Sequence, residues 1–469
     1  MQFHPKKALA LAIITGLALP SLSYATNGYF MIGFGAKSRG MGGVGVAEGV
    51  DGLAAAFNPA TMIDVGTRFD IGGDIFYAPN SVTHSDGTLS DTTVVETSDF
   101  ERSAFSPGDV FLIPNMGGTY KYNDEITFGF AFIGAGMGTR YNQALPSGNT
   151  SYFFNFNGLG DGDGTNGPHG NDVVGIKLLQ TQIPLSIAYK LDEKHTVGAS
   201  MVMAMQYFEA WGLKAFSGDG LSIATTDQNI SNEGTDFSYG AGVRLGWQGK
   251  FMNNDLVLGA NYSSRVYMTP FEKYKGLFAE GGDFDIPENY AIGLAYKVNP
   301  DVKVKFDLQQ INFSDVASVG NPGPYAYTES EFNPLCPGLD TQECKLGGDK
   351  GMGFGWTDQT VYKLGTEYKF NQKLEFRAGV NYGKATIKPD QILFNMIAPA
   401  TVEWHATLGA TYKFTSDIEA SMSYVHGFEN TIKGPTKYQP LGSNPDITVD
   451  NAAISMKQDA IGVELGIKW

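Results

Sequence analysis

Three glycines near the N-terminus, Gly40, Gly42 and Gly45, have the spacing of a dinucleotide-binding fingerprint. In such a site the glycines form a tight turn between a strand and a helix, and the helix N-terminus binds the pyrophosphate. Here the glycines follow an export signal instead of a strand, so the spacing predicts tight backbone turns and no nucleotide.

A second candidate is an acidic segment in which Asp161, Asp163 and Asp172 partly follow the spacing of a calcium-binding loop. Such loops surround the ion with carboxylate and carbonyl oxygens. Thr165 stands where a carboxylate or amide is expected, and the glycine is displaced by one position. A flexible acidic loop is the simpler interpretation, and calcium binding stays open as the alternative.

The six histidines are scattered, and neither a Ser-His-Asp arrangement nor a His-Glu-x-x-His motif occurs. An enzyme that acts on membrane lipids needs a nucleophile and a base close together, and no spacing indicates such a pair. We therefore expect no catalytic residues, no metal and no cofactor.

The two cysteines, Cys336 and Cys344, lie in a segment rich in proline and glycine. In an exported protein this pair predicts a disulfide that closes a small loop. A metal site would need more thiols or histidines nearby than this segment holds.

The first 25 residues are typical of a secretory signal peptide. Lys6 and Lys7 give a basic start, residues 8–19 are apolar, and Ser23 and Ala25 are small residues at the cleavage positions. The apolar stretch is shorter than the roughly 20 residues of a transmembrane helix. We expect the mature chain to begin at Thr26.

The charge balance is acidic, with a formal net charge of −16 that becomes −18 when the two lysines of the signal are removed. Phosphate binding needs a basic face, so nucleic acid is excluded as a partner.

Alternation of apolar with polar or small residues is the strongest pattern in the chain. Near the C-terminus Ile461, Val463, Leu465, Ile467 and Trp469 alternate with glycines and charged residues, and residues 302–308, 374–380 and 404–414 behave alike. Successive side chains of a strand point to opposite faces. Lipid on one side and packed polar groups on the other would produce this pattern.

A Tyr-Lys-apolar sequence followed by a short polar turn occurs five times, beginning at Tyr120, Tyr189, Tyr296, Tyr368 and Tyr412. Long segments rich in Gly, Ser, Asp, Asn and Pro lie between these turns, among them 317–355 and 429–452. Short turns on one side and long loops on the other are typical of outer-membrane barrels. Counting the segments predicts about 14 strands, hence a closed antiparallel barrel with both termini in the periplasm.

Residues 26–64 break the pattern, because they are rich in glycine and carry apolar residues without alternation. We expect this segment to fold inside the barrel as a plug, held by a turn at Asn58, Pro59 and Ala60, since Asn and Pro are turn formers. The domain prediction is a signal peptide over 1–25, a plug over 26–64 and a barrel over 65–469.

Several motifs resemble the FadL family of outer-membrane transporters, which includes long-chain fatty acid transporters and channels for toluene and other aromatic hydrocarbons. The matching residues are 35–43, Asn58-Pro59-Ala60, 110–116, 423–427 and the aromatic C-terminus at Trp469. The resemblance extends along the whole mature chain. Two departures are a terminal Trp in place of Phe, and Ala215 beside Lys214 where a basic residue would meet a carboxylate.

The resemblance implies an N-terminal hatch and passive transport of a hydrophobic small molecule, which leaves sideways through the wall at a kinked third strand. Gly134, Gly136 and Gly138 occupy alternate positions of the expected third strand, and glycines there mark a bend or bulge. Packing space for the plug is the alternative and compatible interpretation.

Ligand-binding candidates are the clustered aromatics Phe153, Phe154 and Phe156 in an outer loop, together with Lys214 and Lys350. Clustered exposed aromatics often form a binding surface, although packing between loops would also explain them. The sequence leaves open whether the ligand is a fatty acid or a neutral hydrocarbon. Rival functions are a porin for polar solutes, a lipid-acting enzyme and a purely structural barrel.

The expected location is the bacterial outer membrane. Expected partners are the hydrophobic ligand, outer-membrane lipids including lipopolysaccharide, and the barrel-assembly machinery during insertion. We expect a monomer.

Overall fold

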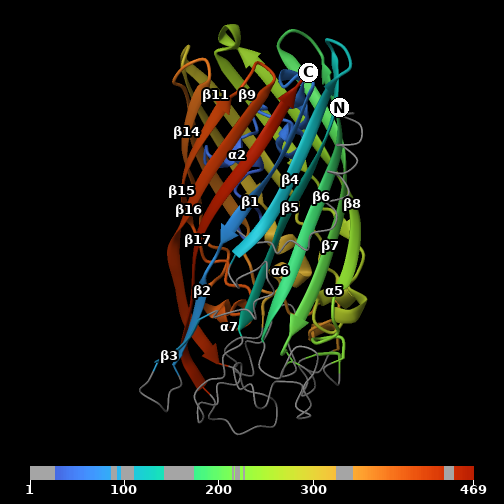
Figure 1. The fold of residues 1–469 in the computed structure, drawn as a ribbon. Helices are drawn as coiled ribbons and strands as arrows, with labels where there is room; N and C mark the ends of the chain where they lie inside the picture. Colours follow the sequence, from blue (N-terminus) through green and yellow to red (C-terminus); the bar gives the residue numbers. More distant parts are fainter. Residues whose placement is uncertain are drawn as a thin grey trace, which may run out of the picture.

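The computed structural model describes residues 27–85, 92–96, 110–141, 174–213, 216, 222–224, 228–323, 342–437 and 448–469. Over these residues one antiparallel sheet closes on itself (Figure 1). The strands of the closed ring are β1 (Arg68–Tyr77), β4 (Val110–Lys121), β5 (Ile126–Tyr141), β6 (Val174–Lys190), β7 (His195–Trp211), β8 (Asp236–Phe251), β9 (Leu256–Ser263), β11 (Asn289–Asn299), β12 (Val302–Ile311), β13 (Gln359–Lys369), β14 (Leu374–Gly383), β15 (Trp404–Lys413), β16 (Ile418–Lys437) and β17 (Thr448–Lys468).

Three further strands extend the ring: β2 (Asn80–Ser85), β3 (Thr92–Glu96) and β10 (Tyr267–Met268). The ring closes because β1 pairs with β4 on one side and with β17 on the other, with Arg68 opposite Lys468. The predicted antiparallel barrel of about 14 strands is therefore confirmed.

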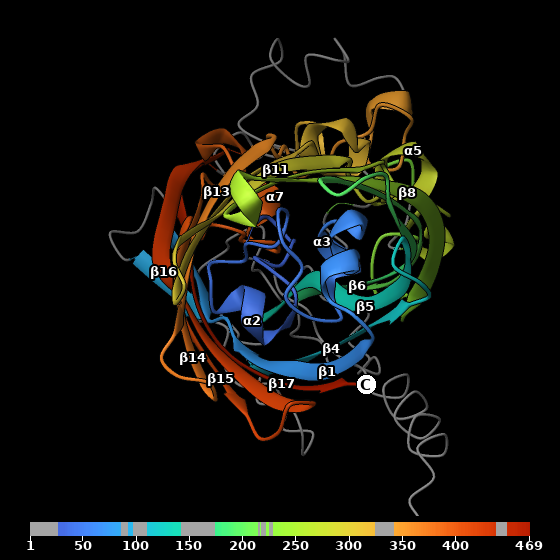
Figure 2. The same ribbon diagram turned by 90° about the horizontal axis from the view of Figure 1, so that it is seen from above.

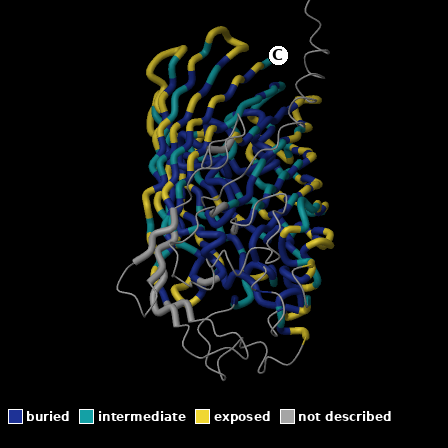
Figure 3. The backbone as a smooth tube through the Cα atoms, turned by 60° about the horizontal axis from the view of Figure 1, so that its bottom comes forward, coloured by how far each residue is buried: buried dark blue, intermediate teal, exposed yellow. Residues whose placement is uncertain are grey.

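The two faces of the wall differ as the alternation predicts. On β17 the outward-facing Ile461, Val463 and Leu465 are exposed, whereas Glu464 between them is buried. Figure 3 shows the same alternation of exposed and buried positions along many strands. The helices of the described part of the chain include none that is both long and apolar enough to cross a membrane.

Each Tyr-Lys sequence lies at the end of a strand, and each is followed by a turn of the same design. The side chain of Asn123, Asp192, Asn299, Asn371 or Thr415 accepts hydrogen bonds from the backbone N–H groups two and three residues further on. Asn and Asp favour such turns because their side chains mimic a backbone acceptor. The repeat thus marks one end of the barrel.

The other end carries the short helices of the long connections. They are η4 (Glu272–Tyr274), α5 (Ala279–Gly282), η5 (Phe313–Asp315), α6 (Ala317–Gly320), η6 (Gln342–Cys344), η7 (Pro389–Gln391) and α7 (Ile392–Asn395), whereas η3 (Met252–Asn254) lies in a short turn. The expectation of a loop over 429–452 was too long, because β16 continues to Lys437 and β17 begins at Thr448. A register shift between Gly427 and Asn430 interrupts the alternation there, which hides the strand in the sequence.

The first described residues lie inside the ring, where Figure 2 shows α2 (Gly35–Arg39) and α3 (Ala54–Phe57) surrounded by strands. A 3-10 helix, η1 (Pro59–Asp64), leads from α3 toward β1. We call residues 27–66 the N-terminal segment. Most of its residues are buried, and the segment lies inside the lumen (Figure 2).

Candidate transport lumen

The turn at Asn58 attaches the N-terminal segment to the wall. The Asn58 side chain accepts a hydrogen bond from Ala60 N (3.0 Å) and donates to Val46 O (2.8 Å) and to Trp247 O of β8 (2.9 Å). Pro59 begins η1, where a residue without an N–H is favourable. One amide side chain therefore joins two parts of the segment and the barrel wall.

Lumen-facing glycines make room for this segment, a feature that the sequence reasoning missed. A β-carbon at Gly198 or Gly246 would collide with the Asn58–Ala60 turn, and one at Gly379 would collide with Met41 and Gly42. Three glycine pairs stand opposite each other on neighbouring strands: Gly198–Gly246, Gly259–Gly293 and Gly365–Gly379. The sequence signal that could have revealed this space was a glycine at an inward-facing position in one strand after another.

Buried ion pairs hold α2 against the strands that close the ring. Lys37 pairs with Glu419 of β16, and Arg39 pairs with Asp74 of β1. Arg68 of β1 bridges to Glu419 at 2.7 Å. Removing one partner of such a pair leaves a buried charge uncompensated, which is strongly destabilising. These contacts therefore fix where α2 lies.

A second ion cluster lies on the opposite wall, where Glu48 of the segment contacts Lys303 and Lys305 of β12. Burial alone would raise the pKa of the Glu48 carboxyl, but the two lysines lower its pKa to about 2. Glu48 is therefore ionised at physiological pH, and it attaches the segment to β12 by charge.

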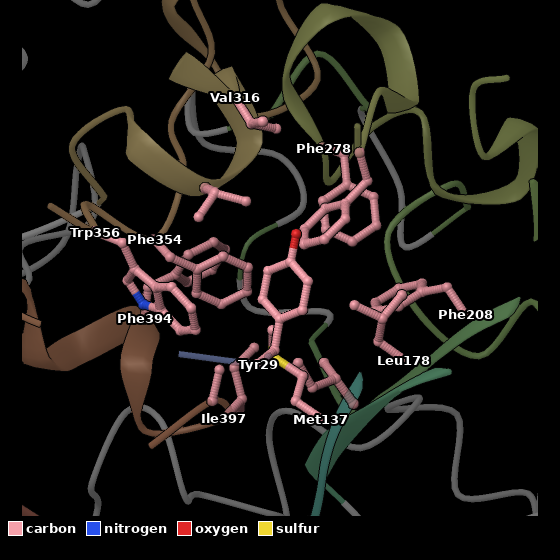
Figure 4. Packing of buried hydrophobic residues seen from close by; sticks show 14 of the residues in the cluster. Tyr29, Met137, Leu178, Phe208, Phe278, Val316, Phe354, Trp356, Phe394 and Ile397 are labelled. Atoms are coloured by element: carbon pink, nitrogen blue, oxygen red, sulfur yellow. The ribbon is translucent and has the colours of Figure 1, made fainter. Parts of the chain in front are cut away.

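The loop end of the lumen is filled by aromatic and aliphatic side chains (Figure 4). Tyr29 of the N-terminal segment packs among Phe313, Phe284 and Trp356, with ring centroids 5.6–6.1 Å apart. Around these rings lie Met137, Leu178, Phe208, Phe278, Phe354 and Phe394. The tip of the segment thus enters an apolar cluster built from the wall and the outer connections.

Between the N-terminal segment and the wall the structure has a cavity of about 50 Å³, which reaches Ile133, Gly134 and Ala135 of β5. Aromatic and aliphatic residues line it together with amide side chains and two cations, Arg244 and Lys363. Arg244 donates to Ser263 Oγ (2.8 Å) and to the carbonyl oxygens of Ala55 and Ala56. Among the described residues no carboxylate lies within ion-pair distance of Arg244, so its charge is balanced only by dipoles.

The wall is interrupted beside this cavity. Strand β4 pairs with β1 from Val110 to Thr119, but it pairs with β5 only from Met116 to Lys121. From Ile133 onward β5 is paired with β6 alone within the described range 110–141. Pro114 lies in the part of β4 that is paired with β1 but not with β5, which suits a strand edge because proline has no N–H to donate.

The predicted kink glycines lie in the part of β5 that is paired with β6 but not with β4. Gly136 has φ +150°, a backbone conformation that L side chains rarely adopt. A β-carbon at Gly134 would lie 3.4 Å from Ile113 Cγ2 of β4. Ile133, Ala135 and Met137 alternate with the glycines and are buried. The glycines thus leave one face of β5 without side chains where its pairing with β4 has ended.

Several predicted residues lie outside the described part of the chain, namely Phe153, Phe154, Phe156, Asp161, Asp163, Asp172, Lys214 and Cys336. The described residues contain no cluster of three potential metal ligands. Lys350 is exposed and lies 3.3 Å from Glu343 in an outer connection, and Cys344 is buried at the end of η6. The structure brings neither of these two residues to the lumen cavity.

The closed ring, its apolar outer face and the occupied lumen define a barrel of the bacterial outer membrane. A family model described as outer membrane protein transport protein (OMPP1/FadL/TodX) matches residues 164–460. This match covers more than half of the chain, and the chain belongs to that family.

Solved structures with the same fold include the toluene transporter TodX of P. putida, at 19% identity and TM-score 0.63 over 94% of this chain and 99% of that one. The toluene transporter TbuX of Ralstonia pickettii has 18% identity and TM-score 0.58 over 93% and 99%. A FadL homologue of Pseudomonas aeruginosa has 13% identity and TM-score 0.63 over 94% and 99%. The chain has no match among the curated proteins.

Proposed function

We propose that the protein transports hydrophobic small molecules passively across the outer membrane, and that the N-terminal segment is its hatch. The observation that carries the proposal is the interruption between β4 and β5 beside a cavity that the segment closes. In this proposal the ligand enters through the apolar cluster at the loop end and leaves sideways at Gly134–Gly138 into the outer leaflet.

The physical reason for a lateral exit is the hydrophobic effect. An apolar ligand gains roughly 25 cal/mol for each Å² kept from water, and a path through the periplasm would lose this gain. The segment meanwhile blocks straight-through leakage of polar solutes, which separates this function from that of an open porin.

In this proposal the hatch moves during transport, and the size of the cavity supports this. Its volume of about 50 Å³ is smaller than the roughly 150 Å³ of a cavity that admits benzene. A ligand of that size therefore passes only when Phe30, Phe34 or Phe57, which line the cavity, shift away from the wall.

The proposed substrate class includes both neutral hydrocarbons and amphipathic acids. The similar structures named as toluene transporters support the first. Arg244 supports the second, because a ligand carboxylate in the cavity would meet a buried guanidinium that has no acidic partner among the described residues. Phe153, Phe154, Phe156, Lys214 and Lys350 are proposed to capture the ligand at the loop end.

The exit is tested by closing it reversibly with a disulfide between Ile113→Cys and Gly134→Cys. A β-carbon at Gly134 would lie 3.4 Å from Ile113 Cγ2, so the two positions are close enough for a disulfide to be attempted. The parent carries Cys336→Ser and Cys344→Ser, so that reductant acts on the new bond alone. Uptake of labelled toluene and of a labelled fatty acid should be lost in the oxidised form and regained on reduction.

The matched control links Ile75→Cys with Leu112→Cys, which stand opposite each other on the paired strands β1 and β4. This bond should leave uptake unchanged. A second variant, Gly136→Phe, should also cut uptake while heat-modifiable gel mobility shows a folded barrel. Full uptake of both compounds by the oxidised protein with the β4–β5 cross-link would refute the lateral exit, and the compound taken up by the unmodified protein identifies the substrate class.

A further inference from the structure

The inner side of the seam between the first and last strands carries an excess of buried carboxylates. Asp70 and Asp74 lie on β1, Glu419 on β16 and Glu464 on β17, and Asp51 of the N-terminal segment faces them. All five are at most 4% exposed. Water is therefore not available to solvate their charges.

Within the described ranges only three cations are buried with these five carboxylates, and their pairings are specific. Lys37 contacts Glu419, Arg39 contacts Asp74, and Arg68 contacts Asp70 and Glu419. A fourth cation, Lys468, approaches Glu419 Oε2 to 4.0 Å from a half-exposed position. Asp51 and Glu464 are left without a described cation in direct contact.

Asp51 and Glu464 are only partly satisfied by hydrogen bonds. Asp51 Oδ1 accepts from Leu53 N at 2.9 Å, and Glu464 Oε2 accepts from Ala36 N at 3.1 Å. Their other oxygens, Asp51 Oδ2 and Glu464 Oε1, are buried without a hydrogen-bond partner among the described residues. Two buried acceptors that lack donors would each gain from one added proton.

The two carboxyl groups meet at Gly35. A β-carbon there would lie 2.5 Å from Glu464 Oε2 and 3.3 Å from Asp51 Oδ2. The two oxygens are thus within about 6 Å, a separation at which like charges oppose each other's ionisation. Gly35 also has φ +76°, so glycine suits this position in both conformation and space.

We propose that Asp51 and Glu464 share a proton across the interface between the hatch and the barrel seam, and that loss of this proton loosens the hatch. The inference rests on the proposed role of the N-terminal segment as a hatch and adds its regulation. The charged groups that face the pair are Lys37 of α2 and Asp70 and Arg68 of β1, with Glu419 of β16 behind them.

The direction of the pH effect follows from Asp51. Burial, and next the charge of Asp70, raise the pKa of its carboxyl from 3.8 to about 6 in the docked segment, against the lowering effect of Lys37 and Arg68. The docked state therefore prefers the protonated form. Docking weakens as pH rises between about 4 and about 6, and levels off above. With one proton involved, each pH unit changes the equilibrium by up to tenfold.

The test uses the full-length protein in planar bilayers and counts ion-conducting openings between pH 4 and pH 7, without any transported ligand. Openings of the wild type should increase by up to about 100-fold between pH 4 and pH 6. Asp51→Asn and Glu464→Gln resemble the protonated side chains and keep their size. Both variants should stay as closed at pH 7 as the wild type is at pH 4.

The matched control is Asp64→Asn, an acidic residue of the same segment that pairs with Lys250 away from the seam. It should open more often at every pH but keep the wild-type slope. A wild-type record that is flat between pH 4 and pH 7, or an Asp51→Asn record with the wild-type slope, overturns the proposal. Because the readout is ion flow, a negative result in the uptake test of the lateral exit leaves this outcome unaffected.

Discussion

The two ends of the lumen hold the same N-terminal segment by different kinds of contact. Toward the short turns, the segment is held by hydrogen bonds of Asn58, by ion pairs of Lys37 and Arg39, and by close approach to glycines. Toward the loops, Tyr29 is held by packing against aromatic rings such as Phe313 and Trp356.

The difference separates a fixed end from an adaptable one. Hydrogen bonds and ion pairs in a buried site require particular distances and directions, so they specify one position of the segment. Apolar packing is non-directional and roughly proportional to buried area, so a hydrophobic ligand can replace a ring without leaving a polar group unpaired. The loop end is therefore suited to ligand entry, and the other end to closing the lumen.

The largest effect is expected from removing the segment altogether. Deleting residues 26–64 from the mature chain should raise ion conductance in planar bilayers strongly, because the ring of strands then surrounds open space. Heat-modifiable gel mobility should show that the barrel still closes. A folded deletion variant with unchanged conductance would contradict the role of the segment as a hatch.

Truncating an aromatic side chain at the loop end of the lumen should impair ligand uptake, while the lumen stays closed to ions. Trp356→Ala removes the contacts of this ring with Tyr29, Phe313 and Phe354, and the loss of its indole removes the donor that lies 2.6 Å from Asn395 Oδ1. The expected cost to packing of the loop end is about 3–5 kcal/mol.

The measurement for Trp356→Ala is uptake of labelled hydrophobic compounds beside ion conductance of the same preparation. Uptake should fall while conductance stays low. Conductance that rises as far as in the deletion variant would show that the loop end of the segment, and not the end toward the short turns, closes the lumen.

A side chain added to a glycine at the other end of the lumen, near the short turns, should have the opposite effect. Ion conductance should rise, while ligand uptake is kept. Gly246→Leu places a side chain where Asn58 Oδ1 lies, and overpacking of this kind costs about 1–3 kcal/mol. Openings should become roughly 5- to 150-fold more frequent. The control is Gly73→Leu, since a β-carbon there meets nothing closer than 3.4 Å. Equal conductance of the two variants would argue that the contacts with glycines do not hold the segment in place at the end near the short turns.

The smallest effect is expected from the predicted disulfide between Cys336 and Cys344. Mass mapping without reductant should find the cross-linked peptide, and freshly extracted protein should contain no alkylatable thiol. The double Ser variant should keep the thermal stability of the barrel, because the hydrogen bonds between strands hold the wall. A marked fall in barrel stability would show that this loop supports the wall.

The sequence alone determined the wall and which of its faces each residue occupies. Alternation at positions such as Val463 and Glu464, and the turns after Tyr296 or Tyr368, depend on neighbours two or three residues away. Such local patterns are readable in one chain, which is why the strand number and the repeated turns were predictable. The turn at Asn58-Pro59-Ala60 could be selected for the same reason, whereas Gly134–Gly138 were selected because the family resemblance implies a kinked third strand.

Tertiary structure alone decided what meets inside the wall. Ala36 and Glu464 are 428 positions apart, and Arg39 meets Asp74 only after the ring has closed. The glycine pairs make room for the segment only when neighbouring strands adopt their register, and the loss of pairing between β4 and β5 after Phe132 is a property of how these two strands meet. No local pattern encodes these contacts, because closing the ring brings together residues from opposite ends of the chain.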